Sequence, residues 1–199
     1  TERWDLSVAG WQYQALKAGY VAGANVEGID AAISKSKKFL KYVAYADGKI
    51  FLHQADTTVV ALDAESGEVV WSAVNGDPSK GETNTATVLP VKDKIIVGIA
   101  GGEYGIRGFL DAYDPKTGER LWRFWTVPGP GETGHDTWSG DSWLRGGAPT
   151  WVTGAYDPDL DLLYWGTGNP GPDFIGEVRL GDNLYSESVI ALDPDKGEL

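Results

Sequence analysis

A short pattern that occurs three times constrains the fold of this chain more than any other feature. Each copy contains an alanine, an aspartate two positions later and a glycine four positions after the aspartate; in the first two copies a tryptophan follows the glycine by four positions. The copies occupy residues 61–71, 112–122 and 191–199. The aspartate accepts backbone amide hydrogen bonds in a turn, and the glycine supplies the positive φ that the turn needs. The tryptophan begins the next strand and packs between neighbouring sheets, so the pattern predicts a repeated strand–turn–strand unit.

The spacing of the copies indicates how many strands each unit contains. Their alanines are 51 and then 79 residues apart. The first interval fits four short strands, and the second fits one such unit with a long insertion, or parts of two units. The 27 glycines and 9 tryptophans among 199 residues are typical of many short strands with indoles between sheets. We therefore expect an all-β fold, a β-propeller with tryptophan-docking repeats; a hairpin repeat in a sandwich is the alternative, and the tryptophan after each glycine favours the propeller.

The region before the repeats has a different character. Residues 1–45 show no clean period and are expected to be irregular, apart from a short helix over residues 30–40 that Asp30 caps. Residues 46–199 are expected to form part of a propeller. Its first strands are predicted as a meander over residues 43–45, 50–53 and 58–63, with a two-residue hairpin turn at Asp47 and Gly48.

Charge and composition exclude several classes of function. The net charge of −12 argues against a nucleic-acid partner, because binding to phosphate backbones needs a basic surface. The chain has no cysteine, so it contains no disulfide and no thiolate nucleophile, and a metal would have to bind oxygen or histidine. No apolar run approaches the roughly 18 residues that a membrane-spanning helix requires.

Two glycine-rich stretches are candidates for a binding site. In residues 101–108, four glycines surround Glu103 between two apolar runs, so a carboxylate and exposed amides lie at the apex of a tight turn. This arrangement can bind a charged small molecule; the alternative is an ordinary hairpin whose glutamate points into water. In residues 166–172, Asn169 is similarly placed after a strand.

The insertion over residues 127–145 is rich in proline and glycine, which predicts a loop without regular structure. It nevertheless contains His135, Trp138 and Trp143, which are unusual residues for a loop without a role. His135 could be a metal ligand, but a histidine bonded to backbone or solvent is the favoured interpretation.

Taken together, these motifs resemble the quinoprotein alcohol dehydrogenases, periplasmic enzymes with pyrroloquinoline quinone (PQQ) and a metal ion on an eight-bladed propeller. The resemblance covers roughly residues 45–199 and rests on the repeated turns and on two motifs, Gly-Gly-Glu-Tyr-Gly-Ile-Arg-Gly and Gly-Thr-Gly-Asn-Pro-Gly-Pro, in the family's order. The resemblance implies that this chain supplies about three of the eight blades.

The resemblance also implies roles for particular residues. Glu103 and Asn169 correspond to the metal ligands, and their oxygen atoms suit Ca²⁺ or a lanthanide ion. Trp151 corresponds to the indole on which the flat quinone lies, although an ordinary core tryptophan is the alternative. The remaining positions that correspond to PQQ contacts are Thr85, Ala100, Gly101 and Gly102. For Thr85, an ordinary strand threonine is an equally good interpretation.

The activity that the resemblance implies is oxidation of a primary alcohol. The metal polarises the quinone, an aspartate takes the hydroxyl proton, hydride passes to the quinone, and the electrons leave to a cytochrome c.

The chain departs from the family pattern at several positions. The catalytic aspartate of the family would lie beyond Leu199, so no catalytic residue is assigned. The family's adjacent cysteine pair is missing, Ala100 replaces a common serine, and Lys35 could stand in for an arginine that contacts the cofactor. Three blades also leave two open edges, which favours a piece of a larger protein or one of several chains that complete a ring.

A catalytically silent propeller that acts in binding or assembly is the alternative function. Such a scaffold needs the repeat turns and docking tryptophans but has no reason to combine Glu103, Asn169 and Trp151.

Overall fold

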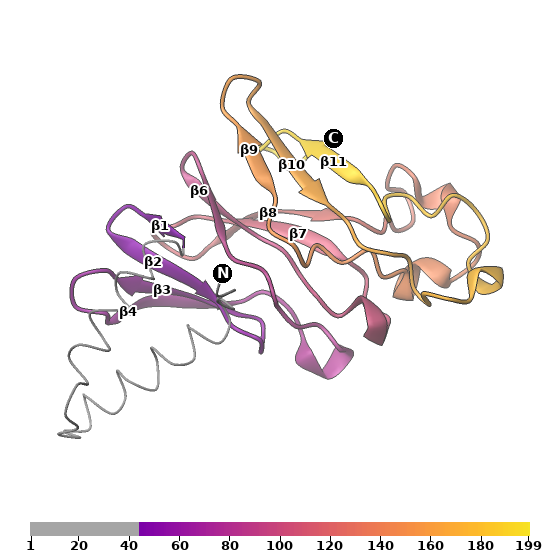
Figure 1. Cartoon of the computed structure of the whole chain (residues 1–199), viewed down its shortest axis with the longest axis horizontal. Helices are drawn as coiled ribbons and strands as arrows, with labels where there is room; N and C mark the ends of the chain where they lie inside the picture. Colours follow the sequence, from indigo (N-terminus) through magenta and orange to yellow (C-terminus); the bar gives the residue numbers. More distant parts are fainter. Residues whose placement is uncertain (1–43) are drawn as a thin grey trace, which may run out of the picture.

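The described part of the chain is built from three antiparallel sheets. The structure, a computed structural model, describes residues 44–199, and the helix predicted over residues 30–40 lies outside them. Within residues 44–199 the regular elements are strands and short 3₁₀ turns, so the all-β prediction is confirmed (Figure 1). The first sheet contains β1 (Tyr45–Ala46), β2 (Lys49–His53), β3 (Thr58–Asp63) and β4 (Val69–Val74). The second contains β5 (Leu89–Val91), β6 (Lys94–Val97), β7 (Phe109–Tyr113) and β8 (Arg120–Trp125), and the third β9 (Ala155–Asp157), β10 (Leu162–Gly166) and β11 (Val189–Leu192).

Each sheet is a meander whose strands follow one another in the chain. The predicted two-residue hairpin joins β1 to β2, with Asp47 at φ 51° and Gly48 at φ 72°. The predicted strands over residues 50–53 and 58–63 correspond to β2 and β3. The pairs β3–β4 and β7–β8 both shift register at the alanine of the repeat, after Ala61 and after Ala112. The repeat therefore fixes the same local geometry in the first two sheets.

The tryptophan of each repeat binds to the turn of the next repeat. The Nε1–H of Trp71 donates to the carbonyl of Pro115 at 3.0 Å, and that of Trp122 donates to the carbonyl of Pro194 at 3.0 Å. A Cβ atom on Gly118 would lie 2.6 Å from Cε3 of Trp71. Glycine is needed there because the indole lies directly on the turn and because φ is +75°. The tryptophan-docking prediction is confirmed.

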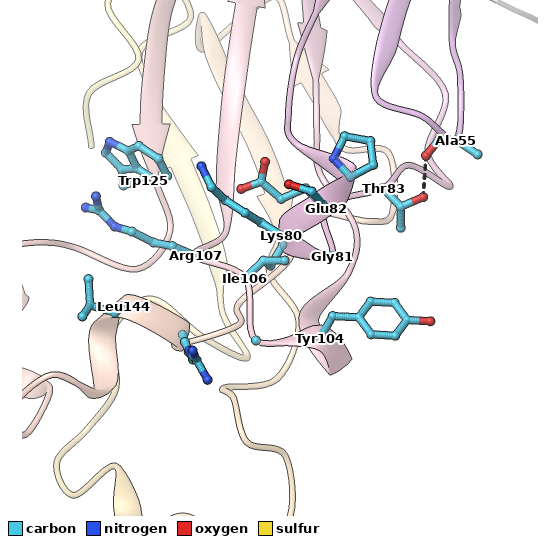
Figure 2. A pocket seen from close by; sticks show the side chains of 14 residues that line it. Ala55, Lys80, Gly81, Glu82, Thr83, Tyr104, Ile106, Arg107, Trp125 and Leu144 are labelled. Carbon is cyan, nitrogen blue, oxygen red and sulfur yellow. Dashed lines mark hydrogen bonds between the residues drawn. The ribbon is translucent and has the colours of Figure 1, made fainter.

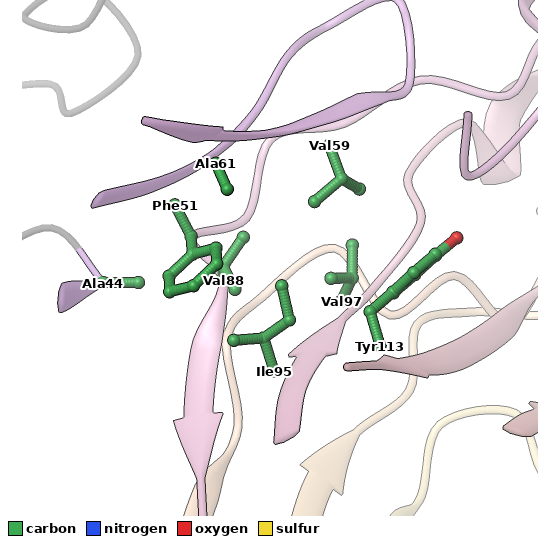
Figure 3. Close-up of a cluster of buried hydrophobic side chains, with 8 residues drawn as sticks. All are labelled: Ala44, Phe51, Val59, Ala61, Val88, Ile95, Val97 and Tyr113. Carbon is green, nitrogen blue, oxygen red and sulfur yellow. The ribbon is translucent and has the colours of Figure 1, made fainter. Parts of the chain in front are cut away.

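The three sheets pack in series, with a separate hydrophobic core at each interface. Between the first and second sheets lie Phe51, Val59, Ile95, Val97 and Tyr113 (Figure 3). Between the second and third sheets lies a second cluster: Val91, Ile96, Leu110, Ala112, Leu163, Trp165, Ile190 and Leu192. The second sheet buries both faces, so β6 and β7 are buried at every position instead of alternating between buried and exposed, and apart from Lys94 and Asp111 their residues are apolar.

A buried ion pair accompanies the first of these cores. Asp111 has a fully buried side chain, and both of its oxygens bond to Arg123, each at 2.6 Å. Asn75, from the segment after β4, donates to the same carboxylate at 2.8 Å, and its carbonyl accepts from Arg123 at 2.8 Å. Burial raises the pKa of Asp111, while Arg123 opposes this shift. The network joins the first sheet to the second by polar contacts inside an apolar interface.

The loops divide between two ends of the sheets. The repeat turns and the β5–β6 and β9–β10 turns lie together, where Lys92 bonds to Asp161 and to Asp195. We call this the turn end. The longer connections lie at the opposite end, the loop end, and include the candidate site residues that the structure describes; Lys35 lies outside the described residues. Within residues 44–199 no helix is long and apolar enough to cross a membrane.

Candidate functional site

Three loop segments meet at the loop end, and the segment over residues 146–151 lies between the other two. On one side, Gly147 donates its backbone N–H to Ile106 and Thr150 donates to Ile99, each at 2.9 Å. On the other side, Ala148 donates to the carbonyl of Asn169 at 2.9 Å. The glycine-rich stretch of Glu103 and that of Asn169 are therefore bound to the same central segment, although they belong to different sheets.

Glu103 and Asn169 are both positioned against Pro149. Each follows a glycine, and a Cβ atom on Gly102 would lie 2.9 Å from the Pro149 ring, while one on Gly168 would lie 2.8 Å from it. The proline thus packs directly on the backbone that precedes each ligand candidate. Both side chains are exposed, and neither has a hydrogen-bond partner among residues 44–199. A carboxylate and an amide oxygen are available in the same region to bind a cation.

Trp151 follows the same segment and keeps much of its surface open. Its side chain is about half exposed, at 51%. Thr85 donates from Oγ1 to the carbonyl of Trp151 at 3.2 Å, so the loop after β4 reaches the tryptophan from the first-sheet side. The indole is therefore not an ordinary core residue, and it offers a surface on which a planar ring can stack.

Ala100, Gly101 and Gly102 form the backbone wall beside these residues. Ala100 is buried and pairs with Thr83 in an antiparallel bridge. Gly101 has φ +113°, and a Cβ atom there would lie 2.0 Å from the carbonyl oxygen of Gly81. Only glycine fits at this position, because a side chain would collide with backbone.

Two residues that hold the site together were not identified from sequence. Pro149 is one, and the other is Thr150, whose Oγ1 donates to Phe109 at 2.6 Å and accepts from the N–H of Ile99 at 2.8 Å. The carbonyl of Thr150 also accepts from Trp165 at 3.2 Å. The sequence contains one indication of this packing, because Gly98 interrupts the apolar run over residues 95–99. A Cβ atom on Gly98 would lie 2.1 Å from the carbonyl oxygen of Thr150.

The two candidate ligands do not form a complete metal site by themselves. Within residues 44–199 no group of three His, Asp or Glu side chains converges. Ca²⁺ takes about six to eight oxygen ligands, so further oxygens would have to come from a cofactor or from other parts of the protein.

The insertion before the central segment contains two short 3₁₀ turns, His135–Thr137 and Ser142–Arg145, where an entirely irregular loop was predicted. His135 Nδ1 lies 3.1 Å from the carbonyl oxygen of Pro128, and its ring contacts Trp143 edge-on at 5.6 Å. The favoured interpretation of His135, a backbone-bonded loop histidine, is thus confirmed. Trp138 is buried and donates to the carbonyl of Leu184 at 2.6 Å.

Comparison with known proteins gives consistent matches. Residues 74–199 match the family described as "PQQ: Glucose/ethanol/alcohol dehydrogenase, beta-propeller domain". The chain is 52% identical over 174 residues to the lanthanide-dependent methanol dehydrogenase of Methylorubrum extorquens, which covers 78% of this chain and 29% of that protein. It is 44% identical over 171 residues to the quinohemoprotein alcohol dehydrogenase ADH IIB of Pseudomonas putida, covering 79% of this chain and 25% of that protein.

Among solved structures, a europium-containing methanol dehydrogenase superposes with a TM-score of 0.73 at 42% identity, covering 78% of this chain and 30% of that one. These matches confirm the predicted β-propeller. The chain spans less than a third of the length of the relatives it matches.

Proposed function

The chain belongs to the family of PQQ-dependent alcohol dehydrogenases, and from this premise we propose that its loop end binds the quinone and the metal ion of a dehydrogenase that oxidises a primary alcohol. The proposal rests on one observation. Gly102 and Gly168, from the loops of different sheets, both pack on Pro149, which brings Glu103 and Asn169 to the same central segment. The half-exposed Trp151 lies two residues further along that segment.

The residues present fit the groups that they would hold. Glu103 and Asn169 supply oxygen ligands, which Ca²⁺ and lanthanide ions prefer over nitrogen or sulfur. Trp151 supplies a flat apolar surface for the quinone, and the backbone of Ala100, Gly101 and Gly102 is the part of the loop that we expect to contact the cofactor. Thr85 is exposed beside Trp151, and its hydroxyl can exchange the 3.2 Å hydrogen bond to the Trp151 carbonyl for one to a cofactor carboxylate.

Bound at this end, the quinone supplies a two-electron acceptor and the ion a Lewis acid. The chain's own contribution is to orient both groups: Glu103 and Asn169 hold the cation, and Trp151 fixes the plane of the ring. Because the loops are tied together by backbone hydrogen bonds, little reorganisation is needed on binding. No residue of the chain is assigned as the base that takes the alcohol proton.

The names of the relatives support the substrate class and the electron acceptor that we propose. Several are named methanol dehydrogenases and three of these carry "[cytochrome c]" in their names, which supports a small primary alcohol as substrate and a cytochrome c as electron acceptor. Calcium and lanthanide ions both remain in the proposal, and two of the relatives are named as lanthanide-dependent. We also propose that further chains complete the propeller. The resemblance to the family implies a periplasmic location.

Titration with PQQ tests the proposal. The chain is titrated with PQQ in the presence of La³⁺ or Ca²⁺ while the quinone absorbance is followed, and Glu103→Ala and Asn169→Ala are compared with the parent. We expect a saturable spectral change in the parent that is lost in both variants and kept in Glu119→Ala, which removes an exposed carboxylate at the turn end. A parent that does not respond would contradict the proposal and leave the catalytically silent scaffold.

A further inference from the structure

A large cavity opens at the loop end beside the Glu103 loop. Its volume is about 1060 Å³, at the upper end of the roughly 300–1,000 Å³ that is usual for small-molecule pockets. Its walls come from the 3₁₀ turn Pro78–Lys80, from residues 104–107 and from the end of the turn Ser142–Arg145 (Figure 2). Glu103 does not line it, so the cavity is separate from the candidate metal ligands although it adjoins the same loop.

The charge of the cavity wall is opposite to that of the chain. Among residues 44–199, Lys80, Arg107 and Arg145 line the cavity, and Glu82 is the one acidic lining residue. The lining residues therefore carry more positive than negative charge in a chain whose net charge is −12, although Arg107 and Lys80 are each paired with a neighbouring carboxylate. A cationic concavity on an acidic protein attracts anions locally while the rest of the surface repels them.

The fixed part of this wall is built around Arg107. Its Nε donates to the carbonyl of Val127 at 2.7 Å, its Nη2 pairs with Glu132, and its guanidinium lies 3.9 Å from the ring centre of Trp125. Lys80, Arg107 and Trp125 lie together on one side of the cavity and Tyr104 lies on the other (Figure 2). Glu82 is also fixed, because it accepts from the N–H of Asp77 at 2.6 Å.

The other two cations are available to a ligand. The side chain of Arg145 packs its stem on Gly105, where an added Cβ would lie 3.4 Å from it, and its guanidinium has no partner among residues 44–199. Among residues 44–199, the side chain of Lys80 has a single partner, Asp77 at 3.4 Å, and both of those side chains are solvent-exposed. Such an exposed pair contributes little and exchanges readily for a better anion.

The chemistry of the walls favours a peptide over a small metabolite. The cavity is lined by residues of four loop segments and includes the exposed side chains of Tyr104 and Leu144 as well as the cations. An extended segment can place carboxylates on Lys80 and Arg145 and a side chain against Tyr104 or Leu144. We propose that this cavity binds an acidic peptide segment of a partner protein, through at least two carboxylates, independently of the quinone and the metal.

Binding of a labelled peptide to the cofactor-free chain tests this proposal. Fluorescein-labelled hexaglutamate is titrated with the chain at low salt, and fluorescence polarisation is measured. We expect saturable binding that weakens as salt is added. Lys80→Ala and Arg145→Ala should each weaken binding roughly twofold to fivefold, the double variant more strongly, and Arg145→Lys less than Arg145→Ala.

Lys116→Ala is the matched control, because it removes one exposed cation from the turn end. It should bind the peptide as the parent does. Equal binding by the double variant and the parent, or an equal loss in Lys116→Ala, would overturn the cavity as the site. Citrate is tested as a free polycarboxylate, and binding of citrate without binding of hexaglutamate would overturn the peptide as the ligand.

Discussion

The indole Nε1 of Trp71 lies 3.0 Å from the carbonyl oxygen of Pro115, which belongs to the repeat turn of the next sheet. Trp122 makes the same hydrogen bond to Pro194 one repeat later. The first and second sheets are therefore each attached to the following sheet at the turn end by one indole, while the loops at the opposite end remain available for a binding site.

Removing the indole N–H should loosen the contact between sheets without removing the ring. We expect Trp71→Phe and Trp122→Phe each to lower the free energy of unfolding by about 1–2 kcal/mol, because each loses a hydrogen bond and some packed surface. Urea denaturation measures the change. Trp151→Phe is the control, since that indole is half exposed and docks in no repeat turn; a loss as large as that of Trp71→Phe would contradict the docking role.

The buried carboxylate of Asp111 should be far more sensitive than an exposed one. In Asp111→Asn, Arg123 keeps its charge in an apolar interface without its partner, so we expect a loss of about 3–5 kcal/mol in the free energy of unfolding. Arg120 lies 3.8 Å from the same carboxylate but is half exposed, so Arg120→Gln should cost no more than about 1 kcal/mol. Similar losses in the two variants, measured by urea denaturation, would argue against the buried pair.

His53 should make stability fall in acid. Burial lowers the pKa of His53 from 6.5 to about 3, against the opposing effects of Asn84 and Asp56. Between these two values the unfolded chain binds a proton that the folded chain does not, so stability decreases as pH falls through this window. The contribution of His53 is about 1.4 kcal/mol per pH unit.

The His53→Leu variant isolates this effect, because leucine does not titrate. The difference in unfolding free energy between variant and parent should shift steadily in favour of the variant from pH 6 to pH 4. A difference that is independent of pH would show that His53 is protonated in the folded state.

A second acid-dependent contact lies at the turn end. Asp195 bonds to Lys92 at 2.6 Å and to Lys94 at 2.9 Å, and these lysines lower its pKa from 3.8 to about 2. A lowered carboxyl pKa stabilises the fold above 3.8, and this stabilisation is lost as pH falls towards 2. Asp195→Asn should therefore lower the melting temperature at pH 6, and the gap to the parent should close in this acid window. Asp159→Asn, in the exposed β9–β10 turn, should show no such gap.

The sequence predicted the architecture well because the repeat carries its own geometry. Aspartate, glycine and tryptophan at fixed spacing specify the turn, its positive φ and the docking contact, and all three were found at the expected positions. The two apolar runs that flank residues 101–108 correspond to β6 and β7 of the second sheet. The partners of Trp71 and Trp122 could not be predicted, because Pro115 and Pro194 are brought to them only by packing of the sheets.

The candidate site was predicted less completely. Glu103 and Asn169 were recognisable because each follows a glycine-rich turn, and the family resemblance assigned Trp151. The role of Pro149 could not be predicted from sequence, because it depends on contacts with Gly102 and Gly168 from distant parts of the chain. The cavity beside Arg107 likewise depends on loops from different sheets. The roles of Glu103, Asn169, Trp151, Thr85 and the backbone at 100–102 all stay predictions.

Tryptophan-sensitised terbium emission tests most directly whether Glu103 and Asn169 hold an ion beside Trp151. Tb³⁺ takes the same oxygen ligands as other lanthanide ions, and it emits on tryptophan excitation only when an indole is close. We expect saturable emission from the parent chain, loss of emission in Glu103→Ala and Asn169→Ala, a dimmer signal at similar affinity in Trp151→Phe, and no change in Glu119→Ala. Emission that is as strong in Glu103→Ala and Asn169→Ala as in the parent would contradict the account.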